Sequence, residues 1–168
     1  MSKSLGNVIA PQRVIEQSGA DILRLWVATT DYTEDMRIGP EIVKGLVDSY
    51  RRLRNTLRYL LGNLNNFAET ERLPLADMPE LERWILHRLG ELNMTLRSSV
   101  SDYSFHTFYS ALHNFCAADL SAFYFDVRKD ALYCDVSGSK RRRAARTVLD
   151  YLFNYLTAWL APALPFTS

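Results

Sequence analysis

Cationic side chains gather in two stretches of the chain, and both could bind phosphate groups. The first stretch lies in one predicted helix, where helical spacing places Arg51, Arg54 and Arg58 on one face with Arg52 beside them. Such a row can contact the phosphates of a nucleic acid, and each contact steepens the salt dependence of binding. The alternative is a solvated face whose arginines pair with carboxylates of a neighbouring helix, and the sequence favours neither.

The second cationic stretch is predicted at one end of the molecule, where one helix ends and the next begins. Arg128 and Lys129 close the earlier helix. Cations at a helix N-terminus oppose the helix macrodipole, so those that open the later helix hint at a role beyond folding. Phosphate binding is one such role, and an ordinary solvated surface is the alternative. The opening cations are Lys140, Arg141, Arg142 and Arg143.

Composition excludes several other kinds of site. The only cysteines, Cys116 and Cys134, form no Cys-x-x-Cys pair and have no histidine at metal-ligand spacing, so we expect no bound metal. Unpaired thiols are typical of reduced, cytoplasmic proteins. No apolar run approaches the roughly 20 residues that span a bilayer, so we expect no membrane segment. The net charge of +1 does not by itself indicate a nucleic-acid partner, but segregated charge can still form one basic face.

The chain divides into two segments of different character. Residues 1–39 hold short apolar patches broken by glycine and proline, and we expect one helix that starts at Pro11 and ends before Gly19. A second helix should cover Ala20 to Thr29, and the polar stretch that continues to Gly39 is predicted to be a loop. We therefore predict a connective region over residues 1–39 and a helical bundle over residues 40–168.

Residues 40–168 show the apolar spacing of long amphipathic helices. An apolar stripe runs from the helix that begins at Pro40 as far as Phe67, and further helices are predicted over 79–100, over 104–132 and from Lys140 to Pro162. Four long helices with short loops predict an all-α fold, an antiparallel helical bundle preceded by a small helical region. In the helix over 104–132, these residues are predicted to face the core: Phe105, Phe108, Leu112, Phe115, Ala118, Ala122 and Phe125.

The opening of the chain resembles a signature of the class I aminoacyl-tRNA synthetases. Met1-Ser2-Lys3-Ser4, followed by Leu5-Gly6-Asn7-Val8-Ile9 and Pro11, is similar to their Lys-Met-Ser-Lys-Ser loop without its first lysine. The resemblance implies that Met1, Ser2, Lys3 and Ser4 contact ATP, with Lys3 foremost. Negative charge develops as pyrophosphate leaves, and an ammonium group on a mobile loop stabilises it. Taken alone, a Lys-Ser tetrapeptide at a terminus is more often a solvated tail, and it is the match of the following residues that favours the signature loop.

Later segments are similar to the isoleucyl-tRNA synthetases. The stretch Gly19 to Trp26 is shared with the valine, leucine and methionine enzymes, whereas three other segments resemble the isoleucine enzymes more closely. These segments are Asp31 to Met36, Ser49 to Leu64 and Ala122 to Asp130. The resemblance implies that the intact protein activates isoleucine with ATP and Mg²⁺ and transfers it to its tRNA, tRNA(Ile).

We expect the chain to be a monomeric fragment, running from the signature loop through most of an anticodon-binding domain that is truncated at its C-terminus. The nucleotide-binding sheet of the family has no counterpart in this sequence, so we expect no catalytic residue here and no activity from the chain alone. Two alternatives stay open. One is the same region of a valyl- or leucyl-tRNA synthetase, and the other is a stand-alone helical bundle that binds tRNA or another protein.

Overall fold

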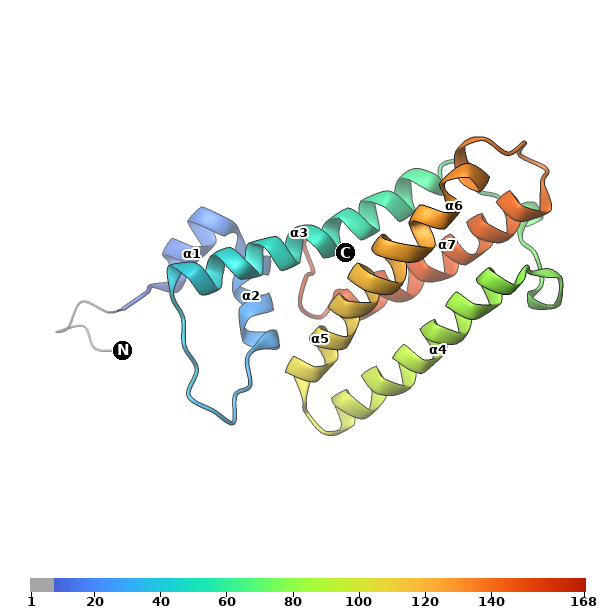
Figure 1. Cartoon of the computed structure of the whole chain (residues 1–168). Helices are drawn as coiled ribbons and strands as arrows, with labels where there is room; N and C mark the ends of the chain where they lie inside the picture. Colours follow the sequence, from blue (N-terminus) through green and yellow to red (C-terminus); the bar gives the residue numbers. More distant parts are fainter. Residues whose placement is uncertain (1–7) are drawn as a thin grey trace.

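The computed structural model describes residues 8–168, which form seven α-helices and no strand (Figure 1). The all-α prediction is therefore confirmed. The signature-loop residues Met1, Ser2, Lys3 and Ser4 lie outside the described residues, so the predicted ATP contact is untested.

The two short helices of the connective region have the predicted bounds. Helix α1 covers Pro11–Ser18 and α2 covers Ala20–Thr29. Pro11 occupies the first turn of α1, where a backbone N–H would have no partner within the helix, so its absence costs no hydrogen bond. Gly19 separates the helices with φ at 90°, a left-handed conformation that favours glycine. The loop after α2 is held by Trp26, whose indole N–H donates to the carbonyl of Arg37 at 3.1 Å.

The bundle consists of α3 (Pro40–Asn63), α4 (Glu80–Ser101), a long segmented helix and α7 (Lys140–Leu160), and consecutive members run in opposite directions (Figure 1). The predicted antiparallel bundle is confirmed. Helix α3 ends four residues before Phe67, because the chain turns at Asn66 with φ at 59°. Two short 3₁₀ turns, η2 (Glu69–Glu71) and η3 (Leu75–Asp77), lead from there to α4.

The segmented helix differs from the sequence prediction in its register. Helix α5 (Phe105–Asn114) continues into a π-helical stretch, η4 (Phe115–Tyr124), and then into α6 (Phe125–Tyr133). A π-helix has more than 3.6 residues per turn, so the inward face moves along the sequence. Leu120 and Tyr124 are fully buried, whereas Ala118 and Ala122 are exposed. The prediction that these two alanines face the core is therefore wrong. Phe105, at the start of α5, is 39% exposed, so its predicted core position is also wrong.

One core joins the connective helices to the bundle. Leu25 of α2 is buried in the same cluster as Leu57 of α3, Leu112 of α5 and Leu156 of α7. The helices α2 and α3 pack together, as do α2 and α5. The connective region is therefore fixed against one end of the bundle and does not bury a separate core.

Polar contacts reinforce this junction. Asp21 is only 6% exposed, and its carboxylate accepts a 2.7 Å hydrogen bond from the Thr167 hydroxyl, which lies beyond the end of α7. One turn later on α2, Arg24 donates to the carbonyls of Pro162 and Ala163 at 2.6 and 3.1 Å. These carbonyls follow the C-terminus of α7, where a cation interacts favourably with the helix dipole.

Candidate nucleic-acid interface

Helix α3 presents its arginines to solvent because its apolar residues face the core. Leu53, Leu57 and Leu60 are nearly or fully buried, and Arg51, Arg52, Arg54 and Arg58 occupy the exposed sides between them. In Figure 1, α3 runs along the upper edge of the bundle. The row from Arg51 to Arg58 extends over about 10 Å along the helix axis, at 1.5 Å per residue.

Few contacts restrain these arginines. Arg51 reaches Asp48 at 3.4 Å, and both side chains are more than half exposed, at 69% and 58%. Such an exposed pair contributes little to stability. Within residues 8–168, the guanidinium groups of Arg52, Arg54 and Arg58 make no hydrogen bond or ion pair. These side chains can therefore bind an external phosphate without first breaking a contact to the described protein. We call Arg51, Arg52, Arg54 and Arg58 the α3 arginine row.

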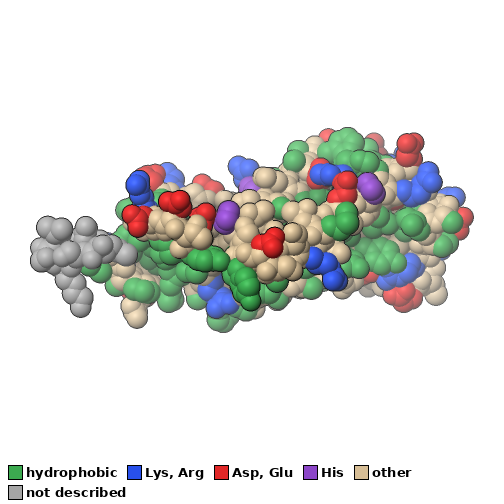
Figure 2. All heavy atoms as spheres, turned by 90° about the horizontal axis from the view of Figure 1, so that it is seen from below, with side chains coloured by type: hydrophobic (Ala, Val, Ile, Leu, Met, Phe, Trp, Pro, Cys, Tyr) green, Lys and Arg blue, Asp and Glu red, His purple; other side chains and the backbone are tan. Residues whose placement is uncertain are grey.

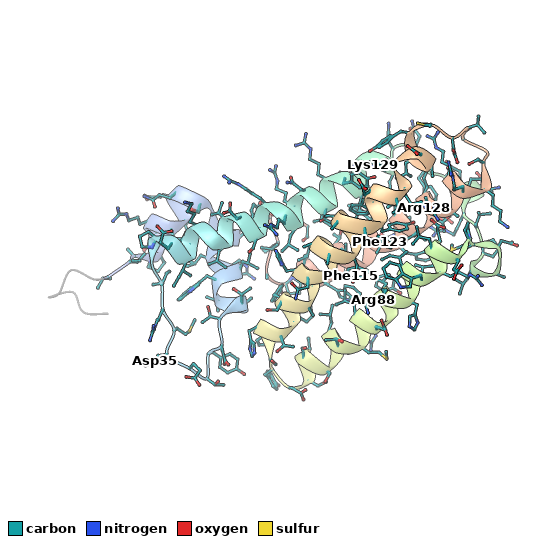
Figure 3. All side chains as sticks on the ribbon, in the orientation of Figure 1. Asp35, Arg88, Phe115, Phe123, Arg128 and Lys129 are labelled. Carbon is teal, nitrogen blue, oxygen red and sulfur yellow. The ribbon has the colours of Figure 1, made fainter. Side chains whose placement is uncertain are left out.

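Arg128 has a different environment from the α3 row. Its guanidinium makes two hydrogen bonds to Glu82, at 2.6 and 2.8 Å, and the two side chains are 12% and 0% exposed. The Tyr124 hydroxyl donates to the same carboxylate at 3.2 Å, and burial raises the pKa of Tyr124 well above its usual value. Arg128 therefore balances a buried charge between α4 and α6, in a part of the structure labelled in Figure 3.

Lys129, one residue later, points outward. Its ammonium group bonds the Asp126 carboxylate at 2.6 Å, and these side chains are 56% and 65% exposed. That hydrogen bond raises the pKa of Lys129. Lys129 is labelled at the upper right of Figure 3, where α6 approaches the C-terminal half of α3. Its exposure makes it available to a ligand that can compete with Asp126.

The cations that open α7 are mostly bound to protein acceptors. Ser139 caps the helix by accepting from the Arg142 N–H at 3.1 Å. Arg141 forms two hydrogen bonds to Asp135, at 2.6 and 2.9 Å, which lower the pKa of that carboxylate. Arg142 donates to the Asp135 carbonyl at 2.8 Å. The carboxylate offsets the unfavourable interaction of these cations with the helix dipole.

The remaining cations near this end serve the loop that follows α3. Arg143 donates to the carbonyls of Thr70 and Glu71, each at 3.1 Å. Arg146, which is 6% exposed, bonds Glu71 at 2.6 Å and two loop carbonyls. By contrast, Lys140 is exposed and has no charged partner within the described residues. Lys140 is thus the member of the predicted α7 group with the freest charge.

One exposed aromatic residue near this end was missed by the sequence analysis. Tyr133 closes α6 and is 62% exposed, and its hydroxyl accepts a 3.4 Å hydrogen bond from the Asn63 amide at the end of α3. The only signal in the sequence is its position one turn after Lys129, which does not distinguish a surface aromatic from a core one.

The other surfaces of the described chain offer different chemistry. Figure 2, which views the molecule from below, shows hydrophobic side chains gathered beside the grey residues. A groove of about 710 Å³ lies between α2 and α5, and its lining includes Val27, Met36, Phe105 and Tyr109.

No group of three or more metal-ligating side chains occurs within residues 8–168. Over the same residues, no helix is long and apolar enough to cross a membrane.

Comparison with known proteins places this geometry in a family. Residues 82–168 match the model for the anticodon-binding domain of tRNA ligase, and residues 1–39 match the model for class I tRNA synthetases of the I, L, M and V group. The first match covers α4 to α7 and extends past Pro162, and the second covers α1, α2 and the loop after them.

Curated relatives agree with both models. An isoleucine–tRNA ligase of Ruegeria pomeroyi is 62% identical over 99% of this chain and 17% of its own length. Isoleucine–tRNA ligases of Gluconobacter oxydans and Zymomonas mobilis are 58% and 56% identical over the whole chain and 18% of their own lengths. This chain thus spans less than a fifth of these relatives. Because the domain model covers more than half of its residues, the chain belongs to the anticodon-binding domain family of tRNA ligases.

Proposed function

We propose that this chain is the tRNA-binding part of an isoleucine–tRNA ligase and that the α3 arginine row contacts the phosphates of the tRNA. The observation that carries the proposal is the contrast between the arginines. Arg52, Arg54 and Arg58 are exposed without a partner in the described structure. By contrast, Arg128 of α6 and the arginines at the start of α7 are bound to protein acceptors. Binding at α3 therefore needs no rearrangement of the protein.

The other predicted contacts differ in how readily they could reach RNA. Lys129 and Lys140 are exposed, and we include them as secondary phosphate contacts. Arg141 is about half exposed, but it would exchange Asp135 for a phosphate. Arg128, Arg142 and Arg143 would each have to leave an acceptor that they hold in the folded protein. We therefore assign these three mainly to folding and expect the least RNA contact from them.

The relatives' names extend the proposal to the whole protein. We infer that the intact enzyme joins isoleucine to tRNA(Ile) with ATP and Mg²⁺, as a cytoplasmic monomer. Met1, Ser2, Lys3 and Ser4 would contact the ATP, with Lys3 supplying the positive charge. In this proposal residues 1–39 connect the catalytic part of the enzyme to the bundle of residues 40–168. The same region of a valine or leucine enzyme is the alternative.

A competition experiment tests the proposal. We would measure binding of labelled isoleucine tRNA to the 168-residue chain and add unlabelled isoleucine, valine or leucine tRNA as competitors. Salt-sensitive binding that isoleucine tRNA competes best is the expected result. Equal competition by all three would assign discrimination to other parts of the enzyme. Absence of any tRNA binding would contradict the proposed role of this chain.

A further inference from the structure

Tyr133 is held firmly although most of its ring is exposed. The Asn63 amide that bonds its hydroxyl also donates to the Tyr59 carbonyl at 2.9 Å, so the amide is itself fixed on α3. Tyr59 stacks on Phe125 of α6, with ring centroids 4.2 Å apart and ring planes at 23°. Burial raises the pKa of Tyr59, and the neighbouring Tyr133 adds to this rise. Tyr133 therefore lies at the contact between α3 and α6, with its hydroxyl bonded to Asn63 and near Tyr59.

One exposed cation from each helix lies on the same side of the molecule as this ring. Lys129 lies one turn earlier on α6, with its side chain 56% exposed. On α3, Arg52 is seven residues before Tyr59 and eleven before Asn63, so helical spacing puts Arg52 on the same side as both. Arg52 and Lys129 thus lie on the side of the molecule where Tyr133 is exposed, with Arg52 about 16 Å before Asn63 along the axis of α3. Two carboxylates also lie near this surface: Asp126, which is bound to Lys129, and Asp130, which is one turn before Tyr133 on α6.

An exposed aromatic ring with cations on the same side of the molecule has the chemistry of a single-stranded RNA site. Proteins bind unpaired bases by stacking them on aromatic rings while cations hold the flanking phosphates. We propose that Tyr133 is a stacking platform for one unpaired base of an RNA loop, with Lys129 on a neighbouring phosphate and Arg52 on a phosphate further along the strand. The proposal rests on the RNA-binding function proposed above and adds a base-binding position to the phosphate contacts of α3.

The alternatives fit the surroundings of Tyr133 less well. A duplex would offer phosphates to the cations but no free base face to the ring. A protein partner would be expected to cover a continuous apolar patch, whereas the turn of α6 that precedes Tyr133 includes the charged Lys129 and Asp130. The cationic border and the single exposed ring together favour an RNA loop.

The test uses three variants of the whole chain and one fluorescent RNA. Tyr133→Leu removes the ring, and Tyr133→Phe keeps it without the hydroxyl. Tyr103→Leu is the matched control, because Tyr103 is 66% exposed in the turn between α4 and α5, at the opposite end of the bundle. The RNA is a hairpin with the anticodon loop of isoleucine tRNA, carrying 2-aminopurine at one loop position at a time. A duplex of equal charge is the second ligand.

We expect one loop position to be quenched on binding to the unsubstituted chain and to Tyr133→Phe. Tyr133→Leu should lose this quenching and bind the hairpin about ten-fold more weakly, since stacking of one base contributes roughly 1–3 kcal/mol. Its affinity for the duplex should be unchanged, and the control should match the unsubstituted chain for both ligands. Far-UV circular dichroism and thermal melting confirm that each variant is folded.

The outcomes separate this proposal from the one on which it rests. Hairpin binding with unchanged affinity and quenching in Tyr133→Leu would overturn the stacking platform and leave RNA binding by α3 intact. An equal loss of hairpin and duplex binding would also overturn it, because a duplex has no base to stack on the ring. Failure of the unsubstituted chain to bind either RNA would overturn both proposals.

Discussion

Two neighbouring residues, Arg128 and Lys129, show how different the roles of adjacent cations are in this molecule. Arg128 faces inward and neutralises Glu82, which is fully buried, whereas Lys129 faces solvent and pairs with an exposed carboxylate. The sequence analysis grouped both as candidate RNA contacts. Their difference depends on Glu82, which lies 46 residues away in the sequence and is brought to α6 only by folding. Residue type and spacing along one helix contain no information about such a partner.

Arg128→Met is therefore expected to destabilise the fold by about 3–5 kcal/mol, because it leaves the Glu82 charge buried and unpaired. Lys129→Met is the matched substitution and should leave the melting temperature nearly unchanged, since its ion pair is exposed. Chemical denaturation of the two variants checks this contrast. Equal stability of the two variants would mean that the Glu82 pair is not the buried contact described above.

Asp126 should oppose RNA binding, because it competes with phosphate for Lys129 and adds negative charge near Tyr133. We expect Asp126→Asn to raise the affinity for the hairpin RNA a few-fold at low salt, with the gain shrinking as salt is added. Asp77→Asn removes the same charge from the exposed turn η3 and is the control. A fall in hairpin affinity for Asp126→Asn, measured by fluorescence anisotropy, would contradict the placement of RNA at this surface.

At the scale of the elements, η4 determines which residues of the long helix reach the core. In a regular α-helix, the spacing from Phe115 would bring Ala118 or Asp119 inward and then Ala122. The π-helical stretch instead buries Leu120 and Tyr124 and leaves Asp119 free to pair with Arg88 of α4 at 3.1 Å. The change of register thus avoids burying a charge and adds a contact between helices.

Leu120→Ala tests this register. Because Leu120 is fully buried, the substitution should cost about 2–5 kcal/mol of unfolding free energy. Ala118→Ser, two residues away on the exposed side, should change stability by less than about 0.5 kcal/mol. Denaturant unfolding of both variants gives the two values. A larger cost for Ala118→Ser than for Leu120→Ala would support the regular α-helical register.

The bounds of the helices were far easier to predict than this register. Pro11, Gly19 and Pro40 each have a conformational preference that marks a helix end, and α1, α2 and the start of α3 are as predicted. The run from Phe115 to Tyr124 has apolar residues on every side, so its sequence fits either register. Packing against α3 and α4 determines which register forms. The apolar spacing within one helix gives no information about that packing.

At the scale of the whole molecule, α2 connects residues near the start of the chain to the turn after α7. Asp21 lies in the first turn of α2, where a carboxylate interacts favourably with the helix dipole. Its carboxylate is also buried and bound to Thr167, whose hydroxyl lies 2.9 Å from that of Tyr50 on α3. Three segments distant in sequence thus share one polar cluster, which fixes the connective helices against the bundle.

Thr167→Val should weaken this junction by about 1–3 kcal/mol, because it leaves the buried Asp21 carboxylate without its hydroxyl donor. Amide hydrogen exchange in α2 should accelerate more than exchange in the core of α7. Thr95→Val removes a hydroxyl that bonds only within α4, and it serves as the control. Thr167→Ser keeps the hydroxyl, so amide hydrogen exchange in α2 should be as slow in this variant as in the unsubstituted chain. Equal acceleration in all three variants would contradict a specific role for this contact.

The candidate site was partly predictable for the same physical reasons as the fold. The α3 arginine row follows from helical spacing, and the structure leaves it exposed. The availability of each cation depends instead on acceptors such as Asp135, which tertiary structure brings within reach. The ATP contact of Lys3 and the division at residue 39 stay predictions.

The most direct test compares two variants that lose equal charge. In one, Arg52, Arg54 and Arg58 of the α3 arginine row are replaced by glutamine. In the other, three exposed arginines elsewhere are replaced, namely Arg37, Arg83 and Arg97. Affinity for isoleucine tRNA is measured between about 50 and 200 mM salt, where each phosphate contact adds roughly 0.7–0.9 to the slope of log affinity against log salt.

We expect the slope to fall by about two for the α3 variant, with much weaker binding at low salt, and to stay unchanged for the control. Equal slopes and equal affinities for the two variants would show that α3 offers only general charge, and would contradict its assignment as the RNA-binding face.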